Sequence, residues 1–501
     1  MKKEDDRWTM CLACQGRGKK SKGLRKKVKL RYLRELELFE KSNGEGVAPV
    51  RPKGHLDICV NCKGLGLVYA AIQTPSDKTL PVTDYPHVAI IGGGIGGVAL
   101  AVACLHRSIP FTLYERDSSF DRRSQGYGLT LQQASRAIEG LGILSLEHGL
   151  VSTRHVVHTT DGKQIGEWGI RKWVPAGSKT ASETTAKTAP KRTNIHIARQ
   201  SLRLALLEQL GGHDAVQWGH QLVDFKESES EGVELSFQIE GEEEEEGVAK
   251  GELKQARADI VVGADGIRST VRRLLIGEEV SPLRYLGCIV ILGICPLADL
   301  DQTLLGSLSD SLLDGATVFQ TANGHERMYM MPYASGSVMW QLSFPMPEED
   351  AKALSAQGAQ ALKDEAYRRC QWHEPIPQII AATVAAQVSG YPAYDRAILE
   401  PELLQQGNRV TLIGDAAHPM SPFKGQGANQ ALLDALALAR GITKDCGSFS
   451  QWREMGVRQS VLTEFEAEMM ERSATKVQGS AEAAEFLHSD VVLHEGDEPR
   501  G

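Results

Sequence analysis

Three glycines, Gly92, Gly94 and Gly97, have the spacing G-x-G-x-x-G and follow the short apolar run Val88–Ile91. In a strand–turn–helix unit the first glycine allows the tight turn, the second admits a pyrophosphate, and the third lets the helix approach the strand. The following helix would point unpaired N–H groups and a partial positive charge at the phosphates. The motif predicts a dinucleotide site, with NAD and FAD both open at this point.

An acidic residue stands where such a site needs one. A second predicted strand, Phe111–Tyr114, ends at Glu115, eighteen residues after Gly97. A carboxylate there can accept hydrogen bonds from both hydroxyls of an adenosine ribose. The glycine-rich stretch is about long enough for a membrane span. However, it holds five glycines within six positions, and the strand and acid that follow favour a βαβ unit.

Four cysteines form two copies of the pattern C-x-x-C-x-G-x-G, at Cys11 with Cys14 and at Cys59 with Cys62. Two such knuckles supply four sulfurs, the number that a closed tetrahedral zinc site uses. The pattern resembles the zinc-binding repeats of DnaJ-type chaperones, which carry four copies. We expect one zinc site from these cysteines, and a dithiol redox pair is the alternative.

Two later strand ends also carry polar residues. The predicted strand Asp259–Val262 runs into a turn with Asp265, at the edge where open α/β sheets bind ligands. The predicted strand Val410–Ile413 ends at Asp415, which is placed to accept a sugar or ribityl hydroxyl. Farther on, a glycine turn precedes a long helix that is expected to begin near Ala428. The N-terminus of this helix offers backbone N–H donors and positive potential, which suit the anionic edge of a ring.

Other elements follow from periodicity and turn residues. Arg199 stands at the entry of a helix expected near Gln200, where it can reach a phosphate or a flavin edge, or form a surface salt bridge. The alternating runs Arg327–Tyr333 and Ser337–Phe344 predict an antiparallel sheet. A helix is expected at Leu129–Gly142 and a terminal packing helix at Val461–Ser480. Four residues that could face a substrate pocket or form core are Met328, Met330, Trp340 and Phe344.

The composition is that of a globular enzyme with two or three domains. Of 501 residues, 42% are hydrophobic and 24% charged. The net charge of −8 argues against nucleic acid as a main partner. The sequence contains no recognisable secretory signal and no other plausible membrane span. The C-x-x-C pairs are more typical of reduced thiols in an intracellular compartment than of disulfide bonds. An intracellular, cytoplasmic location is expected, with an organelle left open.

The segment before the glycine motif differs in composition. It contains the basic run Lys19–Lys29 and apolar residues at helical spacing in Val28–Phe39, and it ends in a polar linker, Gln73–Val82. We expect a module that docks an unknown protein or serves as a structural appendage. Farther along, Trp173–Asn194 is expected to be a surface insertion or lid, and Glu242–Glu246 a solvated hairpin tip.

Three signatures in this order resemble the para-hydroxybenzoate-hydroxylase-like FAD-dependent monooxygenases. They are GGGIGG at Gly92–Gly97, GADGIRS at Gly263–Ser269 and GDAAHPMSPFKGQGAN at Gly414–Asn429, and the match covers roughly Tyr85–Ser480. The resemblance implies an α/β fold in which a Rossmann-like FAD-binding domain is interleaved with an antiparallel substrate sheet, followed by C-terminal helices. The small zinc-type module departs from the family pattern.

The resemblance also assigns roles. It implies that Glu115 binds the adenosine ribose, Arg199 contacts FAD, and Asp265 serves FAD and a transiently bound NAD(P)H. It places Asp415 at the ribityl or pyrophosphate region and the loop Pro419–Gly427 along the isoalloxazine. The expected cofactor-binding residues are Gly92, Gly94, Gly97, Glu115, Arg116, Arg199, Asp265, Gly266, Gly414, Asp415, Gly427 and Ala428, with Pro419, Pro422, Gly425 and Gly427 near the ring.

The implied activity is hydroxylation of a small aromatic or other electron-rich substrate with NAD(P)H and O₂, through a flavin C4a-hydroperoxide. No side-chain acid or base is assigned, and His418 is interpreted as structural. Alternatives are an FAD oxidoreductase of the isoprenoid-reductase type and a non-catalytic flavin-fold adaptor with a zinc module.

The expected domain organisation follows from these assignments. It comprises a module at 1–72, a linker at 73–84, the monooxygenase at 85–480 and a tail at 481–501. Within the monooxygenase, FAD-binding parts are expected at about 85–150, 195–280 and 400–445, and the substrate sheet at about 151–194 and 281–399.

Overall fold

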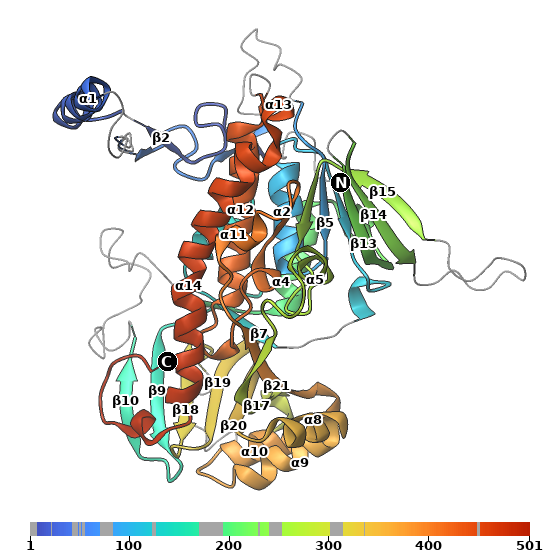
Figure 1. Cartoon of the computed structure of the whole chain (residues 1–501). Coiled ribbons are helices and arrows are strands. Elements are labelled where there is room, and N and C mark those ends of the chain that lie inside the picture. The colour runs from blue at the N-terminus through green and yellow to red at the C-terminus, as the bar shows by residue number, and fades with distance from the viewer. Residues whose placement is uncertain are drawn as a thin grey trace, which may run out of the picture. The chain divides into compact units, whose positions relative to one another are not determined.

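The computed structural model describes residues 8–21, 23–42, 49, 52, 56–70, 84–122, 127–169, 194–228, 231–239, 253–300, 314–334, 336–447 and 451–500. It divides into two compact units (Figure 1). The amino-terminal module comprises the part before residue 84 together with His106–Ser108, and the body comprises Asp84–Leu105 and Ile109–Gly501. The expected linker, the insertion after residue 169 and the acidic hairpin tip lie outside the described residues.

A five-stranded parallel sheet forms the centre of the body, in the order β12-β6-β5-β16-β22. Its inner strands β5 and β16 are buried on both faces, which explains their continuous apolar sequence. All its strands point the same way, so the segments after β5, β6, β16 and β22 meet at one edge. The strands are β5 (Val88–Ile91), β6 (Phe111–Tyr114), β12 (Val216–Gln217), β16 (Ile260–Gly263) and β22 (Val410–Leu412).

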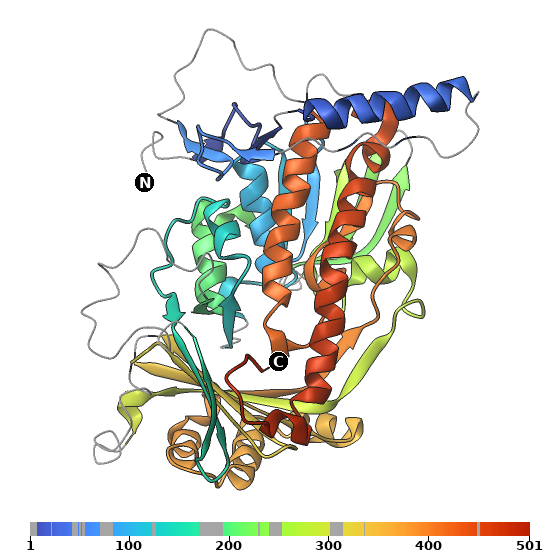
Figure 2. The same cartoon turned by 90° about the vertical axis from the view of Figure 1, so that its left-hand side faces the viewer.

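Helices cover this sheet. Helix α2 (Ile95–Leu105) is almost wholly buried because its residues are small or apolar, and it packs against α12 (Gly427–Asp445) and α4 (Arg199–Gln209). Figure 1 shows α2 between α12 and β5, and Figure 2 shows α14 (Thr463–Phe486) running next to α12. Helix α5 (Thr270–Ile276) follows β16.

A seven-stranded, mostly antiparallel sheet lies at the other end of the body, in the order β10-β9-β18-β19-β20-β17-β21. One face is covered by α8 (Glu348–Ala356), α9 (Ala359–Arg369) and α10 (Ile376–Ala382), and this interface is a second apolar core. The predicted antiparallel pair is present as β19 (Arg327–Ala334) and β20 (Ser337–Pro345). The other strands are β9 (Arg154–Thr159), β10 (Gln164–Trp168), β17 (Leu283–Pro296), β18 (Thr317–Ala322) and β21 (Val388–Arg396).

Two three-stranded sheets complete the described part of the body. One contains β7 (Gly128–Leu131), β8 (Leu150–Ser152) and β11 (Asn194–Ala198). The helix predicted at Leu129–Gly142 is therefore confirmed only at Ser135–Glu139 (α3), and Leu129–Leu131 pairs with β11 as a strand. Pairing with a distant strand overrides the local periodicity. The other sheet contains β13 (His220–Ser228), β14 (Gly232–Ile239) and β15 (Lys254–Ala258).

The carboxyl-terminal segment is folded as far as residue 500. Helix α14 extends to Phe486, six residues beyond the end predicted at Ser480. It is preceded by α13 (Trp452–Val457) and followed by a short 3₁₀ turn, Asp490–Leu493. Arg500 is buried, and its guanidinium donates to the backbone carbonyls of Val492 and Ile165, which fastens this segment to β10. Among the described residues, no helix is long and apolar enough to cross a membrane.

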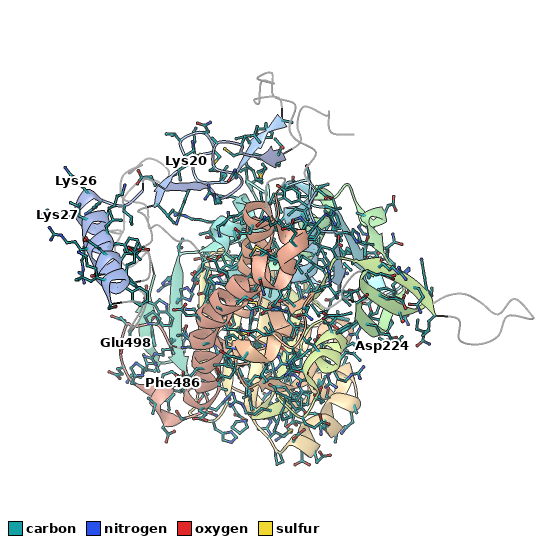
Figure 3. The ribbon with its side chains drawn as sticks, turned by 45° about the horizontal axis from the view of Figure 1, so that its top comes forward. Lys20, Lys26, Lys27, Asp224, Phe486 and Glu498 are labelled. Atoms are coloured by element: carbon teal, nitrogen blue, oxygen red, sulfur yellow. The ribbon has the colours of Figure 1, made fainter. Side chains whose placement is uncertain are left out.

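The described part of the amino-terminal module contains two short antiparallel ribbons and one helix. Strand β1 (Trp8–Met10) pairs with β4 (Leu67–Tyr69), and β2 (Lys19–Ser21) pairs with β3 (Leu56–Ile58). The predicted helix is present as α1 (Lys26–Lys41), and none of its residues is buried. Figure 3 labels the exposed Lys20, Lys26 and Lys27 of this basic segment.

The two cysteine repeats adopt matching loops. Gly18 and Gly66 end the repeats with φ of +69° and +83°, and a Cβ at Gly18 would collide with Gly64 O, as one at Gly66 would with Gly16 O. The N–H of Gly18 donates to Sγ of Cys14 at 3.3 Å, and the N–H of Gly66 donates to Sγ of Cys62 at 3.2 Å. The glycines of the motif are thus needed for the left-handed turns that direct N–H groups at sulfur.

Candidate functional site

A cavity of about 1500 Å³ begins at the carboxyl edge of the parallel sheet and continues to the seven-stranded sheet. Most of the predicted cofactor-binding residues line it together; Gly97 and Gly414 do not. The predicted residues that line it are Gly92, Gly94, Glu115, Arg116, Arg199, Asp265, Gly266, Asp415, Pro419, Pro422, Gly425, Gly427 and Ala428.

The three motif glycines have distinct surroundings. A Cβ at Gly92, whose φ is +110°, would lie 2.6 Å from Ala264 O, and a Cβ at Gly97 would collide with Gly92 O. Gly94 has no atom within 4 Å of a Cβ position and lies on the cavity wall at the start of α2. Gly92 and Gly97 are therefore required by packing, whereas Gly94 leaves open the space in which a diphosphate would meet the helix N-terminus.

Glu115 and Arg203 hold the backbone of this turn from two sides. The Gly93 N–H donates to Oε2 of Glu115 at 2.7 Å, and Nε of Arg203 donates to Gly93 O at 2.7 Å. The Arg203 guanidinium also lies 5.0 Å from the Phe120 ring. Sequence reasoning missed Arg203. Arg203 could have been found from its spacing, because it lies four residues after Arg199 and residues four apart share one face of a helix.

Asp265 lines the cavity, but its carboxylate caps helix α5. It accepts hydrogen bonds from Ser269 Oγ and from the N–H groups of Thr270, at 2.7 Å, and Val271, at 3.2 Å. Burial raises the pKa of Asp265, and these hydrogen bonds oppose that increase. The neighbouring Gly266 has open space around its Cβ position. In this part of the site, a ligand would meet open backbone at Gly266 and a carboxylate already bonded to α5.

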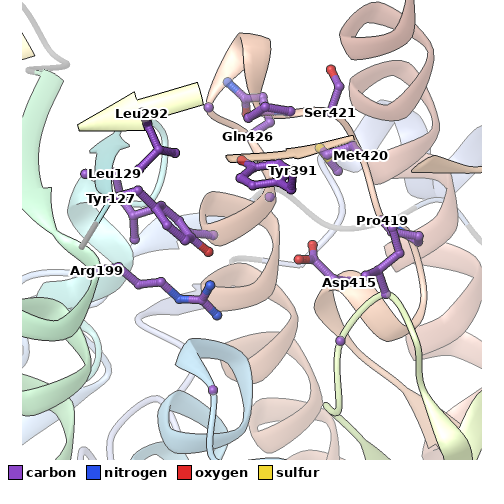
Figure 4. Close-up of a pocket in the computed structure, with 18 of the residues that line it drawn as sticks. Tyr127, Leu129, Arg199, Leu292, Tyr391, Asp415, Pro419, Met420, Ser421 and Gln426 are labelled. Carbon is purple, nitrogen blue, oxygen red and sulfur yellow. The ribbon is translucent and has the colours of Figure 1, made fainter. Parts of the chain in front are cut away.

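Asp415 and Arg199 project into the cavity from opposite sides (Figure 4). Burial raises the pKa of Asp415, and the charges of Arg199 and His418 partly offset this effect. The Arg199 guanidinium lies 5.0 Å from the ring centroid of Tyr127. Asp415 Oδ1 would lie 3.3 Å from a Cβ at Gly427, so the carboxylate stands beside the first residue of α12. The pair offers an acceptor and a cation to one ligand.

Asn429 joins the glycine turn to strand β7. Its Oδ1 accepts from the N–H of Gln132 at 2.8 Å, and its Nδ2 donates to Thr130 O at 2.9 Å and Gly425 O at 2.8 Å. Gln132 Nε2 in turn donates to Lys424 O at 3.0 Å. Asn429 is fully buried. This network fixes the loop that lines the cavity between Pro419 and Gly427.

The seven-stranded sheet supplies the far wall of the cavity. Met328, Met330, Trp340 and Phe344 are buried in the core against the covering helices, so the core interpretation of these residues is confirmed. Alternation along the strands places the intervening side chains on the other face. The cavity-lining residues from β18, β19 and β20 are Gln320, Arg327, Tyr329, Met331, Met339 and Gln341.

The four cysteines of the amino-terminal module are buried and face one point. The Sγ atoms of Cys11 and Cys59 are 4.0 Å apart, those of Cys14 and Cys62 are 3.6 Å apart, and all four lie within 4.8 Å of one another. Tetrahedral zinc with bonds of about 2.3 Å separates its sulfurs by about 3.8 Å. The donor set and its spacing fit one zinc ion.

Comparison with known proteins gives consistent results. A family model described as an FAD binding domain matches residues 85–446. The chain is 30% identical to 3-amino-4-hydroxybenzoate 2-monooxygenase PtnB3 of Streptomyces platensis, over 71% of this chain and 79% of that protein. It is 29% identical to aurachin C monooxygenase/isomerase of Stigmatella aurantiaca, over 71% and 80%. The fold is similar to that of Klebsiella pneumoniae HpxO complexed with FAD and uric acid, with a TM-score of 0.63, 21% identity and coverage of 81% and 90%.

Proposed function

Because the chain belongs to the family of FAD-dependent monooxygenases with this FAD binding domain, we propose that it hydroxylates a small aromatic or other electron-rich molecule. FAD is the cofactor, NAD(P)H the electron donor and O₂ the oxygen source. Bound FAD supplies the transfer of two electrons and the activation of O₂. The observation that carries this proposal is that Gly94, Asp415 and the seven-stranded sheet line one continuous cavity.

The residues that would hold FAD follow from the contacts of the site. The open backbone at Gly94 and the N-terminus of α2 would receive the diphosphate, and Glu115 would accept the ribose hydroxyls. Asp415 would accept a ribityl or sugar hydroxyl, and Arg199 would contact the flavin or its phosphates. The contacts of Gly93 with Glu115 and Arg203 keep this end in place.

The segment Pro419–Gly427 and the N-terminus of α12 would position the flavin ring. The helix terminus directs positive potential toward the cavity, which favours a negative charge on the nearest ring edge. Leu129, Leu292 and Met420 line the cavity in this region (Figure 4) and would exclude water from the reacting atoms. We assign no side chain as acid or base.

The first experiment is reconstitution of the purified chain with FAD. We expect one FAD per chain, a flavin absorption spectrum, and oxidation of NAD(P)H that is stimulated by one class of aromatic compound. Protein that remains colourless after reconstitution contradicts the proposal. Protein that binds FAD but consumes NAD(P)H with no compound of a broad panel favours the adaptor alternative.

For the amino-terminal module we propose a single zinc ion held by the four cysteines, with its folding coupled to metal binding. The exposed apolar side chains Val28, Leu30 and Leu33 of α1 support the further proposal that this module docks a protein partner. All nine cysteines are buried and lie outside disulfide bonds, which supports an intracellular, cytoplasmic location where thiols stay reduced.

A further inference from the structure

The residues Val492–Arg500 form a loop against the edge of the seven-stranded sheet, here called the 492–500 loop. Strand β10 stands at one end of the strand order of that sheet, and the chain passes beside it after α14 (Figure 1). Two residues of the loop, Pro499 and Arg500, line the cavity, as does Trp168 at the end of β10. The loop therefore forms part of the cavity wall, on the sheet that would face the substrate in the proposed function.

The loop completes an interrupted place on β10. Ile165 is the extra residue of a β-bulge between Gln164 and Gly166, where the pairing with β9 shifts. The Ile165 carbonyl accepts from the N–H of Gly496 at 3.0 Å and from Nη2 of Arg500 at 3.2 Å. Backbone groups at a sheet edge otherwise need water or another chain as partners. The bulge and the loop thus satisfy each other's hydrogen-bonding groups.

The close approach of the loop to β10 depends on the absence of a side chain at Gly166. A Cβ there would collide with Gly496 O and would lie 2.9 Å from Nη2 of Arg500. The φ angle of Gly166 lies outside the left-handed region, so the strand itself can accept alanine. An added methyl group would therefore act on the loop, which would have to move away from β10.

One guanidinium organises the loop. The Arg500 side chain is 5% exposed, and its N–H groups donate to backbone carbonyls at both ends of the loop and on β10. The accepting carbonyls are those of Val492, His494, Gly496 and Ile165. Because several carbonyl dipoles converge on this one cation, the hydrogen bonds are charge-assisted. Loss of the guanidinium would free these acceptors and remove the link between the two ends of the loop.

Between its two buried anchors the loop makes few apolar contacts. Val492 is 1% exposed and packs in an apolar cluster with Phe423, whereas the middle of the loop is exposed. Glu495 pairs with Lys163 at 2.5 Å, but both side chains are exposed, and such pairs contribute little to stability. A segment with so little buried apolar surface can open without unfolding the sheet. The exposed residues of the loop are Glu495, Asp497, Glu498 and Pro499.

We propose that the 492–500 loop is a movable wall at the mouth of the cavity that limits the size of the substrate. The guanidinium of Arg500 and the close approach at Gly166 hold this wall in place. With the loop docked, an aromatic ring with short substituents fits, whereas a long substituent meets Pro499 and Arg500. With the loop open, the same substituent extends past β10 toward solvent. This inference rests on the proposed function and specifies the size of its substrate.

The test uses the FAD-loaded full chain and phenols that carry a 4-alkyl chain lengthened from methyl to octyl. The corresponding anilines and benzoates extend the series to other ring chemistries, and binding is followed by the change in the flavin absorption spectrum. For the native protein we expect the methyl compound of at least one series to bind about 10-fold or more tightly than its octyl homologue. Equal or tighter binding of the octyl compound in every series overturns the proposal.

Substitutions at the two anchors should change this preference. Gly166→Ala and Arg500→Ala are each expected to reduce the ratio of methyl to octyl affinity by about 10-fold or more, because the chain is no longer obstructed. Arg500→Lys should give an intermediate ratio, since it keeps the charge but offers fewer donors. FAD content and thermal unfolding verify that each variant is folded.

Hydrogen exchange of the peptide that contains residues 490–500, followed by mass spectrometry, reports whether the loop is released. Exchange should be faster in Gly166→Ala and Arg500→Ala than in the native protein. Two controls should match the native protein in exchange and in binding. They are Gly447→Ala, where a Cβ meets only Thr443 O at 3.6 Å, and Arg257→Ala, at an exposed position on β15.

The outcomes separate this inference from the proposed function. If the loop is released in the variants and the chain-length preference stays native, the loop does not limit substrate size. Native exchange in both anchor variants would show that Gly166 and Arg500 do not hold the loop. Either result leaves the proposed function standing and overturns this inference. A chain that binds no FAD, or that binds FAD and none of these aromatic compounds, loses both.

Discussion

Nε2 of His418 lies 2.8 Å from Oδ2 of Asp434, and both side chains are buried. The same carboxylate accepts the N–H of Gly414 at 2.8 Å and Nη2 of Arg472 at 2.9 Å. One residue of α12 thus holds both ends of the segment from Gly414 to His418, and Asp415 lies between them. The arrangement gives His418 a structural role in the cofactor loop, consistent with the interpretation made from the sequence.

Asp434→Asn is expected to destabilise the body. Burial alone would raise the pKa of Asp434, but His418, Arg472 and the Gly414 N–H outweigh it and lower the pKa, so the native carboxylate is charged. Removing that charge leaves Arg472 less well compensated, and we expect a loss of about 2–4 kcal/mol in the free energy of unfolding. Chemical denaturation measures this loss. Asp445→Asn is the control: Asp445 is the half-buried last residue of the same helix, it pairs with the exposed Lys444, and its substitution should change stability by less than about 1 kcal/mol.

The free energy of unfolding is expected to fall at acidic pH in part because His196 is buried in its neutral form. Burial lowers the pKa of this imidazole to about 3, against about 6.5 in the unfolded chain. The neutral form is therefore favoured on folding, and its contribution is complete above about pH 6.5 and lost as the pH falls toward the folded pKa. Between pH 6.5 and pH 5 the loss is about 2 kcal/mol.

Denaturant unfolding of the native protein and His196→Gln across pH 5–7 tests this prediction. The variant should lose less stability on acidification, whereas His148→Gln, at an exposed position, should follow the native curve. Parallel curves for all three proteins would contradict the assignment of His196 as a buried neutral group.

Alanine at Gly94 and at Gly97 should have different effects. Gly97→Ala forces a Cβ onto Gly92 O, and we expect it to destabilise the body by about 2–4 kcal/mol. Gly94→Ala has room in the protein, so its stability without cofactor should be near native while FAD binding weakens at least about tenfold, or 1.4 kcal/mol. Thermal unfolding and FAD titration of both variants distinguish the two roles. Equal FAD affinity for native protein and Gly94→Ala would contradict the placement of the diphosphate.

Zinc content provides a test of the amino-terminal module. We expect one zinc per chain in the native protein and loss of tight binding in Cys59→Ser, because three sulfurs do not complete the closed site. The matched control is Cys370→Ser, a buried cysteine in the body that should leave the zinc content unchanged. Metal analysis after dialysis against a chelator measures both. Zinc retained in Cys59→Ser, or absent from the native protein, would rule out the site.

Local sequence patterns predicted much of the parallel sheet and its glycine turn. Strands β5 and β6 both have the predicted bounds, and α12 begins within one residue of the expected position. These elements are marked by continuous apolar runs and glycine turns, which are local signals. The family resemblance based on three signatures is confirmed, as are the α/β fold class with antiparallel sheets and the FAD-dependent monooxygenase activity.

Contacts between distant segments could not be predicted in the same way. Asn429 accepts a hydrogen bond from the N–H of Gln132, which is 297 positions away in the sequence. The strand at Leu129–Leu131 forms because it pairs with β11. Arg327 was recognised only as the first residue of a strand, since alternation alone does not tell which face borders a cavity. The side chains that complete the site depend on tertiary packing, and periodicity cannot specify it.

Turnover under ¹⁸O₂ tests the central claim most directly. The FAD-loaded protein is supplied with NAD(P)H and a compound that stimulates its oxidation, and the product is analysed by mass spectrometry. We predict a hydroxylated product that contains one ¹⁸O atom from O₂. A product that carries oxygen only from water, or NAD(P)H oxidation that yields hydrogen peroxide and no hydroxylated product with every stimulating compound, would contradict the account.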